Sequence, residues 1–121
     1  MISAVLYRGE EGYTGCLIEG HSGWADAGGD IVCAAVSILG CTCVNSLESV
    51  AGVVPDVTAN DEGILSFELP PTEGEKQRDA QILMKALKQG LGDLADAYPQ
   101  NLKLSVKNVS RKIGGNHHDE A

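Results

Sequence analysis

Aromatic and basic residues are both scarce in this chain. The first shortage excludes a core built mainly of aromatic side chains, and the second argues against a surface that binds nucleic acid. One Trp, three Tyr and one Phe stand among 121 residues, so aliphatic side chains must supply most of any core. Lys and Arg number 9 against 17 for Asp and Glu, which gives a net charge of −8. Surfaces that bind nucleic acid are usually basic. We therefore expect no direct nucleic-acid binding unless the fold gathers a local basic patch.

Long uninterrupted apolar runs are missing as well. None reaches the ~20 residues that a membrane-spanning helix needs, and residues 1–13 lack the basic-then-apolar order of a signal peptide. We expect a cytoplasmic protein without membrane contact. Hydrophobic residues still make up 43% of the chain, enough for a core. The length suits one domain, which we place at residues 1–110, followed by a disordered tail at 111–121.

The four cysteines do not form the pattern of a disulfide framework or a zinc site. Disulfides in small domains accompany secretion, which nothing in the sequence indicates. Cys41 and Cys43 lie two residues apart in a predicted helix, so they point roughly 200° apart and cannot share a tetrahedral metal. We expect no metal and no cofactor, and we assign Cys16, Cys41 and Cys43 to ordinary packing.

Hydrophobic periodicity predicts seven elements. They are strands at 2–7 and 13–20, a helix at 30–53, strands at 56–60 and 64–69, an amphipathic helix at 73–98 and a strand at 102–109. The hairpin connections are too short for parallel crossovers. The order ββαββαβ therefore predicts an α+β fold, with a mostly antiparallel sheet of about five strands and two helices. Gly90 and Gly92 weaken the prediction for the end of the second helix.

The stretch GGDIVCAAVSILG at 28–40 combines a turn, a helix start and a cysteine. Asp30 is expected to cap the helix, which places Cys33 in the first turn. Free backbone N–H groups and the positive end of the helix dipole favour a thiolate there. Cys33 also fits a small core position, because free cysteines are among the most buried residues. Both interpretations stay open on this stretch alone.

His21 lies at the start and Cys33 just beyond the end of one segment, residues 20–29, whose four glycines predict mobility. If the helix packs beside the end of the second strand, the imidazole can reach the thiol and activate it as a nucleophile. Backbone N–H groups near Cys33 can then form an oxyanion hole. A thiol, an imidazole and an oxyanion hole together suit acyl transfer. The competing interpretation makes His21 a loop-edge residue with a capping hydrogen bond.

Three other residues near His21 and Cys33 also have predicted roles, and two of them have two interpretations. Asp30 can cap the helix or orient His21 as the third member of a triad, and we favour the cap. Ser37, one turn beyond Cys33, is expected to bond within its helix. Trp24 suits a substrate contact, and a surface contact onto the sheet fits equally. Our predicted substrate-binding residues are Gly20, Ser22, Trp24, Gly28, Gly29 and Ser37.

The segment GHSGWADAGGDIVCAAVSIL resembles the ribosomal-processing cysteine proteases, the Prp family. That family's pattern is a Gly–His pair, a glycine-bearing loop, and Asp–Ile–Val–Cys–Ala–Ala followed by Ser. The matching residues are Gly20, His21, Gly28, Gly29, Asp30, Ile31, Val32, Cys33, Ala34, Ala35 and Ser37. The order of elements agrees over the whole chain. The loop between His21 and Asp30 varies in such proteins, so Trp24 gains no role from the resemblance.

The resemblance implies a function that composition could not supply. It implies a Cys33/His21 dyad, a homodimer and an origin in Firmicutes or related bacteria. The implied substrate is a ribosomal protein precursor of the large subunit, whose short N-terminal extension is cut after a hydrophobic and aromatic motif. A net charge of −8 would attract such a basic substrate.

Two further functions stay open at the level of sequence. One is a non-catalytic, dimeric, ribosome-associated assembly factor in which Cys33 only packs. The other is a thiol-dependent acyl transferase or redox sensor that uses the same dyad without a peptide substrate. Rapid alkylation of Cys33 at pH 6 would separate the catalytic functions from the non-catalytic one.

Overall fold

The computed structural model describes residues 1–25 and 30–110, and within them it contains the seven predicted elements in the predicted order. They are β1 (Ile2–Gly9), β2 (Gly12–Glu19), α1 (Ile31–Ser49), β3 (Asp56–Asp61), β4 (Ile64–Glu68), α2 (Gly74–Ala97) and β5 (Leu102–Asn108). The α+β prediction is confirmed. The predicted disordered tail at 111–121 lies outside the described residues.

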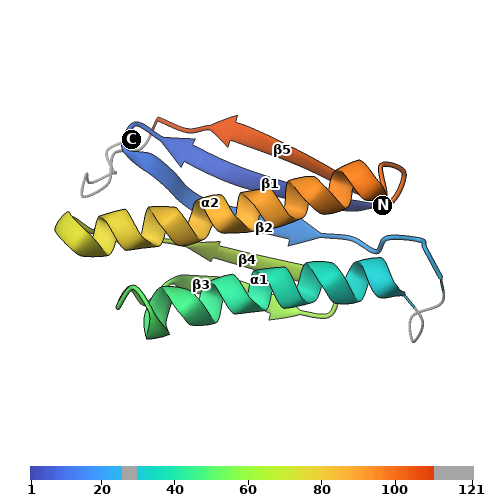
Figure 1. The fold of residues 1–121 in the computed structure, drawn as a ribbon, viewed down its shortest axis with the longest axis horizontal. Helices are drawn as coiled ribbons and strands as arrows, with labels where there is room; N and C mark the ends of the chain where they lie inside the picture. The colour runs from blue at the N-terminus through green and yellow to red at the C-terminus, as the bar shows by residue number, and fades with distance from the viewer. Residues whose placement is uncertain (26–29, 111–121) are drawn as a thin grey trace.

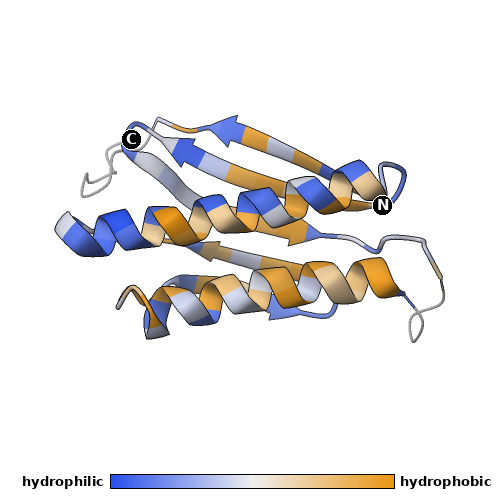
Figure 2. Ribbon diagram, in the orientation of Figure 1, coloured by the Kyte–Doolittle hydropathy of each residue, from blue (hydrophilic) through white to orange (hydrophobic). Residues whose placement is uncertain are grey.

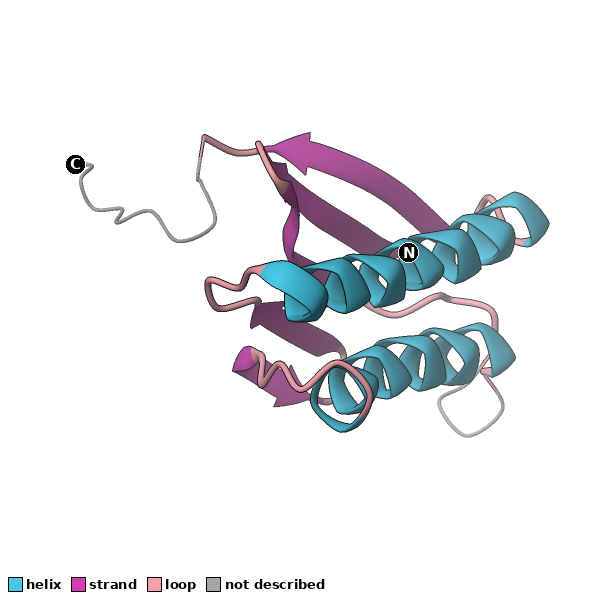
Figure 3. Cartoon of the chain, turned by 60° about the vertical axis from the view of Figure 1, so that its left-hand side comes forward, coloured by secondary structure: helices cyan, strands magenta, loops and turns pink. Residues whose placement is uncertain are grey.

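The five strands form one sheet in the order β3-β4-β2-β1-β5. Neighbouring strands pair antiparallel except for β1 and β5, which are parallel, with Ile2 opposite Leu102. The sheet is therefore mixed, although mostly antiparallel as predicted. The parallel pair is possible because α2 supplies a long crossover that carries the chain past β2 and β1 to the far edge. Both helices lie on one face of the sheet (Figure 1; Figure 3).

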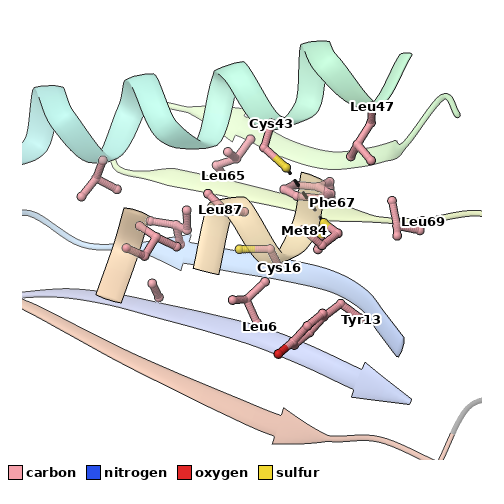
Figure 4. Packing of buried hydrophobic residues seen from close by; sticks show 14 of the residues in the cluster. Leu6, Tyr13, Cys16, Cys43, Leu47, Leu65, Phe67, Leu69, Met84 and Leu87 are labelled. Atoms are coloured by element: carbon pink, nitrogen blue, oxygen red, sulfur yellow. Dashed lines mark hydrogen bonds between the residues drawn. The ribbon is translucent and has the colours of Figure 1, made fainter. Parts of the chain in front are cut away.

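The core lies between this sheet face and the two helices. Ile2, Ala4 and Leu6 of β1 alternate inward, and the single phenylalanine, Phe67 on β4, is almost fully buried among aliphatic and sulfur-containing side chains (Figure 4). Alternate residues of a strand face one side of a sheet, so this pattern is what the sequence periodicity predicted. Burial of mainly aliphatic residues compensates for the scarcity of aromatic ones.

Two glycines within the helices mark places where neighbouring elements of the fold approach closely. A Cβ at Gly40 would lie 2.7 Å from Leu65 Cδ2, and one at Gly90 would lie 2.8 Å from Leu39 Cδ2. Both distances are too short for a real side chain. Gly90 therefore allows α2 to pack tightly on α1, and α2 continues past it to Ala97. The helix-weakening effect of glycine is outweighed by this contact.

Helix α1 ends at Ser49, four residues earlier than its predicted end at Val53. Gly52 takes a left-handed conformation with φ of 70°, and the Val53 N–H donates to the Leu47 carbonyl at 2.8 Å. Glycine adopts this conformation at little cost, so it reverses the chain beyond the last turn.

Helix α1 is uncharged over most of its length and more apolar than α2 (Figure 2). By length and composition alone it is able to cross a membrane. One stripe of it faces the core, formed by Val32, Val36, Gly40, Cys43 and Leu47. A core helix of a soluble protein passes the same test of composition. Its other side exposes aliphatic side chains, among them Ile38, which is 67% exposed.

The prediction that Cys16, Cys41 and Cys43 all pack is right for two of them and wrong for Cys41. Cys16 and Cys43 are buried, and burial raises their pKa values to about 12 and about 11, with a further small rise for Cys16 from nearby Cys43. Cys41 is exposed. Residues two apart on a helix point in opposed directions, so burying Cys43 turns Cys41 outward.

Candidate active site

Cys33 lies in the first turn of α1, and Asp30 caps that turn as predicted. One Asp30 carboxylate oxygen accepts from the Cys33 backbone N–H at 2.9 Å, and the Asp30 carbonyl accepts from the Ala34 N–H at 3.2 Å. The local sequence explains the cap, because an aspartate before an apolar run offers a short acceptor to orphan N–H groups. The cap thereby fixes Cys33 in the first turn of α1.

The second oxygen of Asp30 accepts a hydrogen bond from the Ser22 hydroxyl. This bond, followed by the Cys33 N–H, lowers the pKa of Asp30 to about 2, so the carboxylate is ionised at neutral pH. Both oxygens are thus engaged by Ser22 and Cys33. Among the described residues neither oxygen bonds to His21, which favours the cap over the triad role.

Ser22 connects the segment after β2 to the thiol. It is 2% exposed, and its backbone N–H donates to Cys33 Sγ at 3.3 Å. Its hydroxyl also accepts from the Trp24 N–H at 3.0 Å, and its carbonyl accepts from Asn101 Nδ2 at 2.9 Å. Ser22 was predicted as a substrate contact. In the structure its side chain is buried, bonds to Asp30 and the Trp24 N–H, and is not among the residues that line the cavity described below.

His21 stands at the end of β2, against the turn between β3 and β4. The Gly20 N–H donates to the Gly63 carbonyl at 2.9 Å. Gly63 has a φ of +81°, and a Cβ there would lie 3.1 Å from His21 Nε2. The turn therefore supports the imidazole from one side. Among the described residues the thiol accepts its hydrogen bond from Ser22 and makes none with His21.

His21 and Cys33 line one cavity of about 400 Å³. Its lining residues come from the start of β1, the end of β2, the first half of α1 with its cap, and the hairpin between β3 and β4. The end of β2 and the start of α1 lie at the same end of the molecule (Figure 1). Ile18, Val36 and Ile64 make part of its wall apolar. Such a cavity, in which a thiol and an imidazole stand beside apolar walls, is typical of a site that binds a ligand.

Sequence reasoning missed two parts of this cavity. The turn residues Asn60, Asp61, Glu62 and Gly63 form one wall, yet in the sequence they indicated only a hairpin connection. Cys41 also lines the cavity, two helical turns beyond Cys33. The spacing of Cys33, Ser37 and Cys41 by four residues was the available signal, since residues so spaced share one helix face.

Only some of the other residues predicted to contact substrate line the cavity. Gly20 and Ser37 line the cavity. Trp24 does not; its ring contacts Tyr98 edge-on, with centroids 5.1 Å apart, and remains 48% exposed. It is therefore a surface contact onto the end of α2. Gly28 and Gly29 lie outside the described residues.

Metal chemistry finds no support in the part of the chain that the structure describes. Within residues 1–25 and 30–110, no three His, Cys, Asp or Glu side chains cluster as metal ligands.

Replacing Asp30 by Asn should make stability less dependent on acid. A carboxyl whose pKa falls from 3.8 to about 2 on folding stabilises the folded state above pH 4, and that contribution is lost as the pH falls from about 4 to about 2. Asn caps as well but does not titrate. Urea unfolding at pH 2 to 5 should show that the difference in free energy of unfolding between wild type and Asp30→Asn shrinks as the pH falls through this window. Ser22→Ala should weaken the same dependence, and parallel curves would contradict the assignment.

Gly63→Ala should lower kcat/KM for peptide cleavage by about tenfold to a hundredfold, because the new Cβ would displace the His21 imidazole. Gly74→Ala is the matched control. Gly74 also has a left-handed φ, +65°, but no atom lies within 4 Å of an added Cβ. Cleavage rates and melting temperatures of both variants separate contact from backbone strain. Equal losses of activity would mean that the contact with His21 is unimportant.

The chain is similar to known proteins along most of its length. The family model described as Cysteine protease Prp matches residues 1–103. Ribosomal processing cysteine protease Prp of Bacillus subtilis (strain 168) is 30% identical over 110 residues, which cover 88% of this chain and 97% of that protein. The protein of the same name from Staphylococcus aureus (strain Mu50 / ATCC 700699) is 26% identical over 108 residues, covering 88% of this chain and all of that one, 100%.

Two crystal structures share the fold. SMU.848 from Streptococcus mutans has a TM-score of 0.78 and 29% identity, over 90% of this chain and 96% of that chain. The processing protease Prp from S. aureus, in complex with a covalently linked product peptide, has a TM-score of 0.79 and 25% identity, over 88% of this chain and 100% of that chain.

Proposed function

The chain belongs to the cysteine protease Prp family, and from this premise we propose that it removes the N-terminal extension of a large-subunit ribosomal protein, with Cys33 as nucleophile and His21 as base. One observation carries the proposal. Cys33 stands in the first turn of α1, accepts the Ser22 N–H, and shares a cavity with His21. A thiolate is favoured at such a position.

The proposed reaction has two stages. His21 takes the Cys33 proton, and the sulfur attacks the scissile carbonyl carbon to form a C–S bond. The C–N bond then breaks as His21 returns the proton to the leaving amine. Water, deprotonated by His21, hydrolyses the thioester and releases the acid and the free thiol. The unbound site need not show the His21–Cys33 hydrogen bond, because catalytic contacts often tighten only when substrate binds.

A peptide substrate is supported by both the relatives and the cavity. The S. aureus Prp was crystallised with a covalently linked product peptide. Cysteine nucleophiles form covalent intermediates with their substrates, so a peptide substrate is compatible with the role proposed for Cys33. Apolar walls at Ile18 and Val36 suit a hydrophobic and aromatic motif. Asp61 and Glu62 also line the cavity, and together with the net charge of −8 they suit a basic ribosomal protein.

We also propose a cytoplasmic homodimer, as the family resemblance implies. The exposed side of α1 supports a dimer, because Ile31 and Ile38 there are 54% and 67% exposed. Aliphatic side chains exposed together on one helix face favour burial against a partner.

The competing non-catalytic function requires Cys33 to be a packing residue. Cys16 shows what such a residue looks like here, since it is 1% exposed. Cys33 is only half-buried and opens into the cavity beside His21. This difference favours the protease.

Incubation with the ribosomal protein precursor from the same organism tests the function. Mass spectrometry of the products should show the mature protein and the released extension, cut at one bond. An intact precursor after incubation with folded, reduced enzyme would overturn the proposal. Acyl transfer to a small acceptor without any cut precursor would instead favour the transferase.

A further inference from the structure

We propose that Asn101 is a positioning residue for the Cys33 thiolate: its side-chain amide holds the Ser22 carbonyl, and so keeps the Ser22 N–H directed at Cys33 Sγ. The inference rests on the proposed function, in which Cys33 is the nucleophile. It assigns a role to the turn between α2 and β5, which supplies nothing to the cavity wall.

Two hydrogen bonds carry the argument. Asn101 Nδ2 donates to the Ser22 carbonyl at 2.9 Å, across 79 positions of sequence. The Ser22 N–H donates to Cys33 Sγ at 3.3 Å. The N–H and the carbonyl of Ser22 belong to two adjacent peptide planes that meet at its Cα. Holding the carbonyl fixes one of these planes, and so narrows the range over which the other plane, with its N–H, can turn away from the sulfur. The turn before β5 thereby acts on the sulfur without touching it.

Asn101 is itself held firmly. Its backbone N–H donates to the Tyr98 carbonyl at 3.0 Å, and its carbonyl accepts from the Ile2 N–H at 2.9 Å, which ties the turn to β1. Tyr98 in addition contacts the Trp24 ring. The segment from Ser22 to Trp24 is therefore attached at two points, Tyr98 and Asn101, to the turn that follows α2. A donor mounted on such a rigid support loses little order when charge develops on the sulfur.

The chemical benefit lies in the charge of the acceptor. A hydrogen bond to an ionised acceptor is roughly twice as strong as one between neutral groups. The Ser22 N–H therefore favours the thiolate over the thiol, and loss of its alignment should make the thiol harder to ionise. Asp30 also restrains Ser22, through the hydroxyl, but Asp30 caps α1 as well. Asn101 is the contact that can be removed without disturbing that cap.

Other ionisable groups line the same cavity as Cys33 and contribute to the electrostatic background of its titration. The end of β2, helix α1 with its cap, and the β3–β4 turn bring His21, Asp30, Cys41, Asp61 and Glu62 to the cavity that Cys33 lines. None of them is altered by a substitution at Asn101. A change in the pH profile of Cys33 in such a variant would therefore report the Ser22 donor.

The test is the rate of iodoacetamide alkylation of Cys33 from pH 5 to 10, resolved from the other cysteines by peptide mass spectrometry. Asn101→Ala and Asn101→Leu both remove the donor, and Leu retains most of the volume. Both should react about three to ten times more slowly at pH 6, the effect of losing one hydrogen bond to a charged group, and the profile should move to higher pH. The rate at high pH should be nearly unchanged. Asn108→Ala should behave as wild type, because the Asn108 side chain accepts a hydrogen bond from exposed Arg8 and from no other side chain within residues 1–25 and 30–110.

Two results would overturn the inference. One is a wild-type pH profile in both Asn101 variants. The other is a wild-type profile in Asn101→Leu with a shifted one in Asn101→Ala, which would mean that Asn101 only fills space. Alkylation requires no peptide, so this test is separate from the proposed function. A shifted profile in an enzyme that leaves the precursor intact would retain the positioning role and reject the substrate.

Discussion

Cys33→Ser should abolish cleavage of the ribosomal protein precursor, lowering kcat by about three orders of magnitude or more, while the fold stays intact. The hydroxyl is a far weaker nucleophile than the thiol under the same base. It is nearly the same size and can still accept the Ser22 N–H that now reaches Sγ. Mass spectrometry of precursor digests and thermal melts on the same preparations would measure both effects.

Cys41→Ser is the matched control for this experiment. Cys41 lines the same cavity from the same face of α1 and is more exposed than Cys33, but it lies two turns away from the helix start. Its removal should leave the cleavage rate close to wild type. Retained peptidase activity in purified Cys33→Ser protein, or its loss in Cys41→Ser, would show that the wrong cysteine has been chosen as nucleophile.

His21→Ala should lower kcat by a factor of about a hundred to ten thousand, the usual contribution of a positioned general base. His21→Gln should lose as much, because glutamine keeps a polar side chain against the Gly63 turn but cannot take a proton. Alkylation of Cys33 at neutral pH should also slow in both variants.

This second readout decides what His21 does. Equal alkylation rates in wild type and His21→Ala would mean that the imidazole does not accept the thiol proton. Loss of cleavage with unchanged alkylation would instead assign His21 to a later step, such as protonation of the leaving amine. Both results would require a different base from the one proposed.

Local sequence was sufficient for the elements and for the start of α1. Strand alternation, helical spacing and turn residues predicted all seven elements, with ends that differ by a few residues. Asp30 was predicted as the cap, and it is. These features depend on residues within a few positions of one another, since a cap satisfies N–H groups two or three residues ahead. Such short-range causes can be read directly along the chain.

The surroundings of the thiol were decided by the tertiary structure. The support of His21 by Gly63, the burial of Ser22 and the bond from Asn101 all join segments distant in sequence. No periodicity encodes which turn reaches the end of β2, because that depends on the strand order and on α2 carrying β5 to the far edge beside β1. Residue types and their spacing along the chain were enough to predict which residues react. What holds those residues in place depends on the packing of distant segments, because each of these contacts forms only when the strands have taken their order in the sheet.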